Sequence, residues 1–319
     1  MSEVGLKPLA GFKEPGACSV SACGKVILCG EHAVVYGSHA VAIPLLDMKI
    51  DLALAPSHAA KEPSVTMKMA DRQMTQRVAD VFLEACELLG LEKFPVSITG
   101  DSSLPIGSGV GSSAALCVGA LRGLAASYSL SLSRETLGRL GNALEKRFHG
   151  NPSGLDTAVV AYESSLLFKK GEPVDIRVLS PKRSFSLALI DSGVPSSTKA
   201  MIQLASPFFR NEGGERRLAL FDDNAVLTAK AIEQGSLMDL AFLIGQCGEY
   251  LAQLGVVTDS LREIMDVAVG FGCLAAKTTG AGGGGVVLAL LDPDKELDTL
   301  CKLRDFFGAG RVYSVSLSC

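Results

Sequence analysis

The chain has 319 residues, of which 48% are hydrophobic and 20% are charged. This composition supports a large buried core and excludes the disordered, collagen-like and low-complexity classes. The formal net charge of −4 provides no overall attraction for nucleic acid or for an anionic membrane. We therefore expect neither as a partner, and an anionic ligand would have to be attracted by a local site.

Nine cysteines are scattered along the sequence without a CxxC pair. Their odd number and their apolar neighbours favour buried free thiols in a reducing compartment over a disulfide framework. The N-terminus lacks the apolar core of a signal peptide, and no apolar run is long enough to span a bilayer. The prediction is a soluble protein of the cytoplasm, with a peroxisome-like organelle as the alternative.

The first half of the chain alternates strand and helix patterns. Residues 20–28 are apolar up to a break at Gly30, and alternation of apolar residues at 50–55 predicts a strand. The other predicted elements here are helices at 75–89, 112–128 and 133–148, a strand at 96–99, and two short strands within 157–168.

The second half separates helices from strands. Alternation at 185–189 begins what we expect to be a second domain, with a boundary marked by Pro181, Lys182 and Arg183. The predicted elements that follow are helices at 222–234, 237–254, 260–271 and 295–307, and strands at 286–291 and 313–317. This order indicates an α+β fold.

The segment 105–115, Pro-Ile-Gly-Ser-Gly-Val-Gly-Ser-Ser-Ala-Ala, follows a strand pattern and opens a helix. Its glycines allow backbone N–H groups to converge on an anion, and the free N–H groups at the helix start add to this. We favour a phosphate loop over a flexible turn that caps a helix, although the pattern is neither a Walker A loop nor a dinucleotide fingerprint. The candidate phosphate-binding residues are Pro105, Gly107, Ser108, Gly109, Val110, Gly111, Ser112 and Ser113.

Two carboxylates flank a rigid turn. Gly150, Pro152 and Gly154 end a predicted helix and return Asp156 toward the region of Glu145. One carboxylate of such a pair could bind Mg²⁺ while the other lies beside an acceptor hydroxyl. The alternative is an exposed helical Glu and a turn Asp, and this signal alone does not separate the two.

A glycine run follows Lys277, with five glycines and one alanine in residues 280–285. Ordering so many glycines is entropically costly, so we expect close approach of this backbone to a ligand or to another strand. The alternative is a hinge or linker, which the apolar strand pattern directly after Gly285 disfavours.

The segment 25–37, here called the first motif, adds Lys25, Glu31 and His32. A lysine at this place is compatible with a surface position or with a cation aimed at phosphate or at a developing alkoxide. A lone histidine is more often structural than catalytic. No Cys/His cluster indicates a protein-held transition metal, and no GxSxG elbow indicates a hydrolase.

Together these segments resemble the motifs of the GHMP kinase superfamily, which includes galactokinases and homoserine, mevalonate and phosphomevalonate kinases. Within the superfamily the chain is most similar to the mevalonate kinases, because Glu31-His32 is followed by the apolar residues 33–35 and by the segment 149–156. The resemblance implies a two-domain fold. Its N-terminal domain (1–183) would be like ribosomal protein S5 domain 2, and its C-terminal domain (184–319) would be ferredoxin-like.

The resemblance also implies a reaction: transfer of the γ-phosphoryl group of ATP, with Mg²⁺, to the C5 hydroxyl of mevalonate in isoprenoid and sterol precursor synthesis. Asp156 would be the catalytic base and Lys25 its charged partner, while Ser113 and Glu145 would hold Mg²⁺. The implied substrate-binding residues are Lys25, Glu31, His32, Asp156, Thr198, Gly280 and Ala281.

One position departs from the pattern of the superfamily. Many relatives have an Arg two residues before the residue that matches Thr198, and this chain has Ser196. Lys199 or backbone groups would then have to hold the substrate carboxylate. The resemblance further suggests a homodimer and feedback inhibition by prenyl diphosphates.

Two alternatives remain at this point. The chain is compatible with another small-molecule kinase of the superfamily, acting on phosphomevalonate, galactose or homoserine. It is also compatible with a non-catalytic ligand sensor on the same fold, although the presence of Lys25, Glu145 and Asp156 together favours catalysis.

Overall fold

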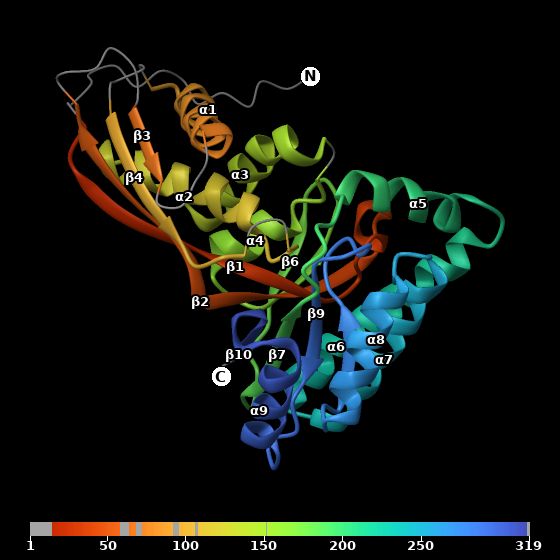
Figure 1. Ribbon diagram of the computed structural model, residues 1–319. Coiled ribbons are helices and arrows are strands. Elements are labelled where there is room, and N and C mark those ends of the chain that lie inside the picture. Colours follow the sequence, from red (N-terminus) through yellow and green to blue (C-terminus); the bar gives the residue numbers. More distant parts are fainter. Residues whose placement is uncertain are drawn as a thin grey trace. The chain divides into compact units, whose positions relative to one another are not determined.

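The structure is a computed structural model that describes residues 15–57, 64–67, 72–91, 96–105, 108–150 and 152–317 (Figure 1). The chain forms two compact units. The first uses the described parts of residues 1–24, 46–104 and 111–163, and the second those of 25–45, 105–110 and 164–319. Each unit therefore combines segments that are far apart in the sequence. The domain boundary expected near residue 183 stays a prediction.

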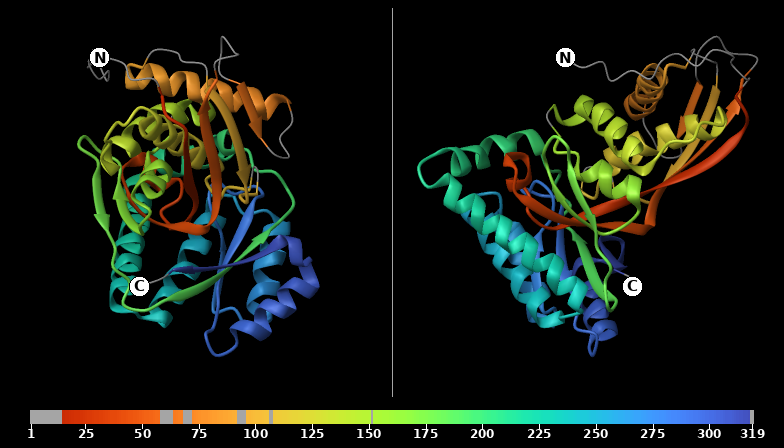
Figure 2. Two further views of the ribbon diagram at one scale, coloured as in Figure 1. Left: turned by 90° about the vertical axis from the view of Figure 1, so that its left-hand side faces the viewer. Right: turned by 180° about the vertical axis from the view of Figure 1, so that it is seen from behind.

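The first unit is a sheet covered by helices on one face (Figures 1 and 2). It contains β3 (Ser64–Met67), α1 (Arg72–Leu89), β4 (Val96–Ser102), α2 (Ser112–Ser127), α3 (Arg134–His149), α4 (Leu155–Tyr162), and parts of the long strands β1 (Cys18–Cys29) and β2 (His39–Pro56). Strand β4 pairs antiparallel with β2 and parallel with β3. A Cβ on Gly123 of α2 would lie 2.9 Å from Leu54 Cδ1 of β2, so this glycine allows the helix to pack closely on the sheet.

The second unit contains an antiparallel sheet in the order β10-β7-β9-β8. Its elements are η1 (Ala33–Tyr36), β5 (Leu166–Lys169), β6 (Asp175–Val178), β7 (Phe185–Asp191), α5 (Thr198–Arg210), α6 (Gly214–Gln234), α7 (Leu237–Gln253), α8 (Asp259–Gly270), β8 (Ala275–Thr278), β9 (Val286–Leu290), α9 (Glu296–Phe307), η2 (Ala309–Arg311) and β10 (Val312–Leu317). Strand β9 is buried throughout, and Val287 and Ala289 pack with Leu261 of α8 and Leu303 of α9. This apolar contact holds the helices on the sheet.

Most predicted elements are confirmed, but the interpretation of 157–168 as two strands is wrong. The first part of that segment is helix α4, and only its end enters β5. The β-branched Val159 and Val160 suggest a strand, yet both are fully buried in the helix. Tertiary packing therefore overrides local propensity at α4. The sequence analysis also does not predict helix α5.

The described cysteines are free thiols, and most of them are buried, as the sequence predicts. Burial raises the pKa of the Cys273 thiol to about 12, which keeps it protonated. No helix within the described ranges has both the length and the apolar character needed to cross a bilayer.

Candidate functional site

Lys25 lies against the phosphate-loop segment within the second unit. Its side chain is 2% exposed, and Nζ donates a hydrogen bond to the Gly109 carbonyl oxygen at 3.0 Å. Its backbone N–H donates to the Val110 carbonyl at 2.9 Å. The buried ammonium is therefore held beside the loop that the sequence assigns to phosphate, and the surface alternative for Lys25 does not apply.

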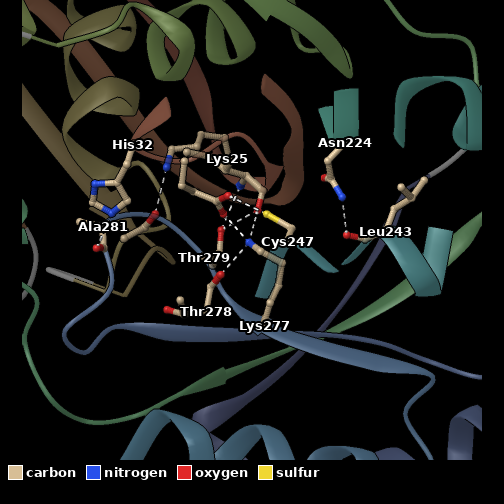
Figure 3. Close-up of polar contacts among 12 residues, drawn as sticks. Lys25, His32, Asn224, Leu243, Cys247, Lys277, Thr278, Thr279 and Ala281 are labelled. Carbon is tan, nitrogen blue, oxygen red and sulfur yellow. Dashed lines mark hydrogen bonds and ion pairs between the residues drawn. The ribbon is translucent and has the colours of Figure 1, made fainter. Parts of the chain in front are cut away.

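The turn of the first motif is tightly constrained. Gly30 has φ 90°, and a Cβ there would lie 2.5 Å from Ala40 Cα, so only glycine fits. His32 also has a positive φ of 61°, and its Nε2 lies 2.9 Å from the Ala281 carbonyl oxygen. Burial lowers the pKa of His32, so the neutral ring donates from Nε2 to this carbonyl. The first motif and the glycine run are thus joined directly (Figure 3).

Glu31 has a partner that the sequence analysis did not identify. Its side chain is 1% exposed and forms an ion pair with Lys277 of β8, which is fully buried (Figure 3). The Cys247 thiol donates to the other carboxylate oxygen at 3.7 Å. The one sequence signal for this buried ion pair is the position of Lys277 within the otherwise apolar or small-residue stretch 274–279.

The glycine run lies close to other backbone segments, which confirms the expectation of close approach. A Cβ at Gly282 would lie 2.5 Å from the Val256 carbonyl oxygen, and one at Gly284 would lie 2.5 Å from that of Val194. A Cβ at Gly285 would lie 2.8 Å from the Ser108 carbonyl oxygen of the phosphate-loop segment. Side chains in this run would therefore push apart the segments that meet there.

We expect Gly285→Ala to destabilise the protein and to weaken nucleotide binding. The left-handed backbone, with φ 78°, costs a non-glycine residue about 1–3 kcal/mol, and the contact with Ser108 adds to this. Thermal unfolding and calorimetric titration with MgATP would measure the two effects. Gly310→Ala is the matched control, because nothing lies within 4 Å of its Cβ position. Equal unfolding temperatures for the two variants would contradict the interpretation.

In the first unit, Ser113 and Glu145 bring together two side-chain oxygens of the kind that can ligate a metal ion. Gly111, with φ 82°, precedes helix α2, and Ser113 Oγ in its first turn donates to Glu145 Oε1 at 3.0 Å. Glu145 is 2% exposed. A hydroxyl and a carboxylate are hard oxygen ligands of the kind that Mg²⁺ takes together with substrate phosphates. The donor set therefore fits a magnesium ion.

The predicted return of Asp156 toward the end of α3 that carries Glu145 is also present. A Cβ on Gly141 of α3 would lie 3.3 Å from Thr157 Cβ, so α3 and α4 pack closely at this point. Glu145 lies one helical turn beyond Gly141, and Asp156 precedes Thr157 in the first turn of α4. Asp156 is partly exposed.

The other residues that the sequence analysis assigned to phosphate or substrate binding have the following positions. Ser108 Oγ donates to the Pro105 carbonyl at 2.9 Å, and Ser112 opens α2. Gly107 lies outside the described residues. Thr198 begins α5 and is partly exposed, while Gly280 approaches Gly109.

Ser196, at the position that departs from the pattern, has a defined partner. Its hydroxyl donates to the Gly282 carbonyl at 2.5 Å. The hydroxyl hydrogen of Ser196 is thus already donated within the protein. Lys199 and backbone groups remain the candidates for binding the carboxylate of the substrate. Lys199 is exposed in the first turn of α5.

Comparisons with known proteins agree with these motifs. The family model "GHMP kinases N terminal domain" matches residues 73–164, and "GHMP kinases C terminal" matches residues 228–309. The mevalonate kinase of Pyrococcus horikoshii is 30% identical over 331 aligned residues, covering 93% of this chain and 95% of that protein. The mevalonate kinase of Pyrococcus abyssi is 27% identical, covering 95% of this chain and 96% of that protein.

A solved structure gives the same fold. The crystal structure of L. major mevalonate kinase in complex with R-mevalonate superposes with a TM-score of 0.82 at 21% identity, covering 97% of this chain and 99% of that chain. The α+β fold expected from the order of the elements and the two-domain GHMP kinase fold implied by the resemblance are thereby confirmed. The chain belongs to the GHMP kinase family.

Proposed function

We propose that the protein is a mevalonate kinase, which transfers the γ-phosphoryl group of ATP to the C5 hydroxyl of mevalonate and yields 5-phosphomevalonate. The observation that carries the kinase assignment is the hydrogen bond of the buried Lys25 to Gly109, together with the hydrogen bond that ties Ile27, two residues further along β1, to Thr279 before the glycine run. The full-length similarity to mevalonate kinases supports mevalonate as the acceptor.

The residues of the chain would act mainly by alignment and charge stabilisation, which is what phosphoryl transfer demands. Backbone N–H groups of the phosphate-loop segment and of the start of α2 would bind the phosphates. Asp156 would accept the proton of the C5 hydroxyl as a general base. Lys25 would stabilise the developing alkoxide and the negative charge of the transition state.

Ser113 and Glu145 would hold the magnesium ion. When bound there, Mg²⁺ would supply positive charge that offsets the negative charge of the phosphate groups. The hydrogen bond between the two side chains fixes their oxygens near the start of α2, where the helix dipole also favours phosphate. Through the metal, these two side chains would contribute to holding the phosphates of the nucleotide.

We expect Glu145→Gln to raise the free Mg²⁺ concentration needed for half-maximal activity by about 10–100-fold, because a neutral amide is a poor magnesium ligand. Titration of Mg²⁺ at fixed ATP would measure the shift. Glu84→Gln is the matched control, because Glu84 forms a partly exposed ion pair with Arg147 in the same unit. If Glu145→Gln needs the same free Mg²⁺ concentration as the wild type, Glu145 is not a ligand of the metal.

The substrate assignment is tested by coupled ADP release with mevalonate, phosphomevalonate, galactose and homoserine, each with MgATP. We expect kcat/KM to be highest with mevalonate. A higher value with another acceptor would identify a different kinase of the family. MgATP binding without ADP release from any acceptor would favour the ligand sensor.

Two further expectations, a homodimer and feedback inhibition by prenyl diphosphates, rest on the resemblance alone, and we propose both. We also propose a cytoplasmic location, which the free cysteines support. The anionic heads of prenyl diphosphates would compete for the phosphate-binding N–H groups. Inhibition that is not competitive with ATP would count against that competition.

A further inference from the structure

We propose that Lys277 and Glu31 form a positioning pair for phosphoryl transfer, and that Glu31 acts through Lys277 and not by direct contact with the acceptor. The proposal rests on the kinase function above. It assigns a role to Lys277 and replaces the substrate-binding role that the family resemblance implies for Glu31. Neither residue is a catalytic residue in this account, because neither would touch the reacting atoms.

The ammonium of Lys277 and the carboxylate of Glu31 both have hydrogen-bond partners within the protein. Lys277 Nζ donates to Glu31 Oε1, to the Thr278 carbonyl at 2.6 Å and to the Ile27 carbonyl at 3.4 Å. An ammonium has three N–H donors, and all three have acceptors here. Glu31 Oε2 accepts from the Cys247 thiol at 3.7 Å. The pair is thus satisfied by the protein itself.

The charge state of the pair follows from its surroundings. Burial by itself would lower the pKa of Lys277, but the opposing influences, led by the charge of the adjacent Glu31 carboxylate, leave that pKa above its ordinary value. Burial also raises the pKa of the Cys247 thiol well above its ordinary value, which keeps that thiol a donor to Glu31. Lys277 is therefore charged near neutral pH, and its attraction to Glu31 persists there.

The pair is one of three contacts that join the first motif to the segment 277–281. Thr279 Oγ1 accepts from the Ile27 backbone N–H at 3.0 Å and donates to the Ile27 carbonyl at 2.9 Å. Beyond the pair, His32 donates to the Ala281 carbonyl (Figure 3). The two segments are therefore joined at three places.

This arrangement sets the position of Lys25. Lys25 lies on β1 two residues before Ile27, whose backbone is held by Lys277 and Thr279. Loss of the ion pair would let the end of β1 shift against β8. A misplacement of about 1 Å at a reacting group can cost about 100-fold in rate. The expected consequence is a lower kcat with little change in substrate affinity.

A purely structural pair would behave differently. Buried ion pairs are often replaceable by apolar groups without loss of the fold, so burial alone does not establish a functional role. The discriminating readout is the division of the effect between kcat and KM, together with the coupling of the two substitutions.

The experiment compares the full-length variants Lys277→Met, Glu31→Gln and the double variant with the wild type. Steady-state rates with mevalonate and MgATP give kcat and both KM values, and calorimetric MgATP binding gives the fraction of folded protein. Lys302→Met is the matched control, because Lys302 forms an exposed i,i+4 ion pair with Asp298. We expect this control to match the wild type.

Each single variant is expected to lose about 100-fold in kcat, with both KM values within about threefold of the wild type. The double variant should be no slower than the slower single variant, because both substitutions remove one interaction. A KM for mevalonate raised about tenfold or more in Glu31→Gln alone would show direct substrate contact and overturn the proposal. Wild-type kcat in either single variant, after correction for the folded fraction, would also overturn it.

If Lys277→Met does not fold, Glu31→Gln and Thr279→Val decide the question by the same criteria. Thr279→Val removes the hydroxyl that bridges the Ile27 N–H and carbonyl groups. If the wild type does not phosphorylate mevalonate, this result contradicts the proposed function but not the positioning proposal. The positioning proposal is then measured with whichever acceptor supports ADP release in the wild type.

Discussion

Asp156→Asn should nearly abolish turnover while MgATP still binds. The amide has the shape of the carboxylate but cannot accept the proton of an acceptor hydroxyl, and general-base catalysis contributes about 10²–10⁴-fold to rates. Asp156 is partly exposed in the first turn of α4, away from the core positions whose substitution would unfold the protein. The loss should therefore appear in kcat.

The measurement is steady-state ADP release together with calorimetric titration of MgATP. Asp80→Asn is the control, because Asp80 forms a surface ion pair with Arg147 in the same unit. The control should keep the wild-type rate. A rate for Asp156→Asn within about threefold of the wild type would remove Asp156 as the base, whatever its position.

Lys25→Met should lower kcat by about 10²–10³-fold, which is typical of the loss of one charged or hydrogen-bonding group that stabilises a transition state. The methionine keeps the length and apolar body of the side chain, so the buried space stays filled. What is lost is the positive charge and the hydrogen bond to the Gly109 carbonyl. Lys25→Arg should restore little, because the planar guanidinium differs in shape and hydrogen-bond geometry from an ammonium.

Single-turnover rates with saturating MgATP and mevalonate would isolate this effect on the chemical step. Lys49→Met, on an exposed part of β2, is the control with the same substitution. An unchanged single-turnover rate, together with a raised steady-state KM for ATP, would mean that Lys25 contributes to ground-state binding only. That outcome would contradict its proposed part in the transition state.

The glycine-rich segments could be predicted from the sequence because their backbone requirements are local. Five glycines before an apolar strand imply close approach, and in the structure the carbonyl oxygens of Val256, Val194 and Ser108 lie 2.5–2.8 Å from the positions that Cβ atoms would take. Ser133 as a helix cap is local in the same way, and its side chain accepts from the Thr136 N–H.

The ion pair of Glu31 and Lys277 could not be predicted in this way, because 246 positions separate its members. A sequence pattern shows that Lys277 stands among apolar residues but not which carboxylate would neutralise it. Helix α4 is a related case. Its valines favour a strand, whereas in the structure Gly138 and Gly141 of α3 allow α4 to pack closely as a helix.

The organisation into units also depends on long-range pairing. β2 pairs with β5 near its beginning and with β4 near its end, so its two ends contribute to different units. The sequence pattern of β2 shows alternation at 50–55 but carries no signal for these partners. The compact units are discontinuous along the chain, and local patterns in the sequence carry no signal for such an arrangement.

The central claim is tested most directly by locating the phosphate ester in the product of a reaction of the wild-type protein with mevalonate and MgATP. Phosphorus–proton correlation NMR of the quenched mixture shows which carbon carries the new ester, and a parallel ADP assay gives the stoichiometry. We expect one ester per ADP, with the phosphorus coupled to the C5 methylene protons. ADP formed without an ester on mevalonate, or an absence of ADP at saturating MgATP, would contradict the account.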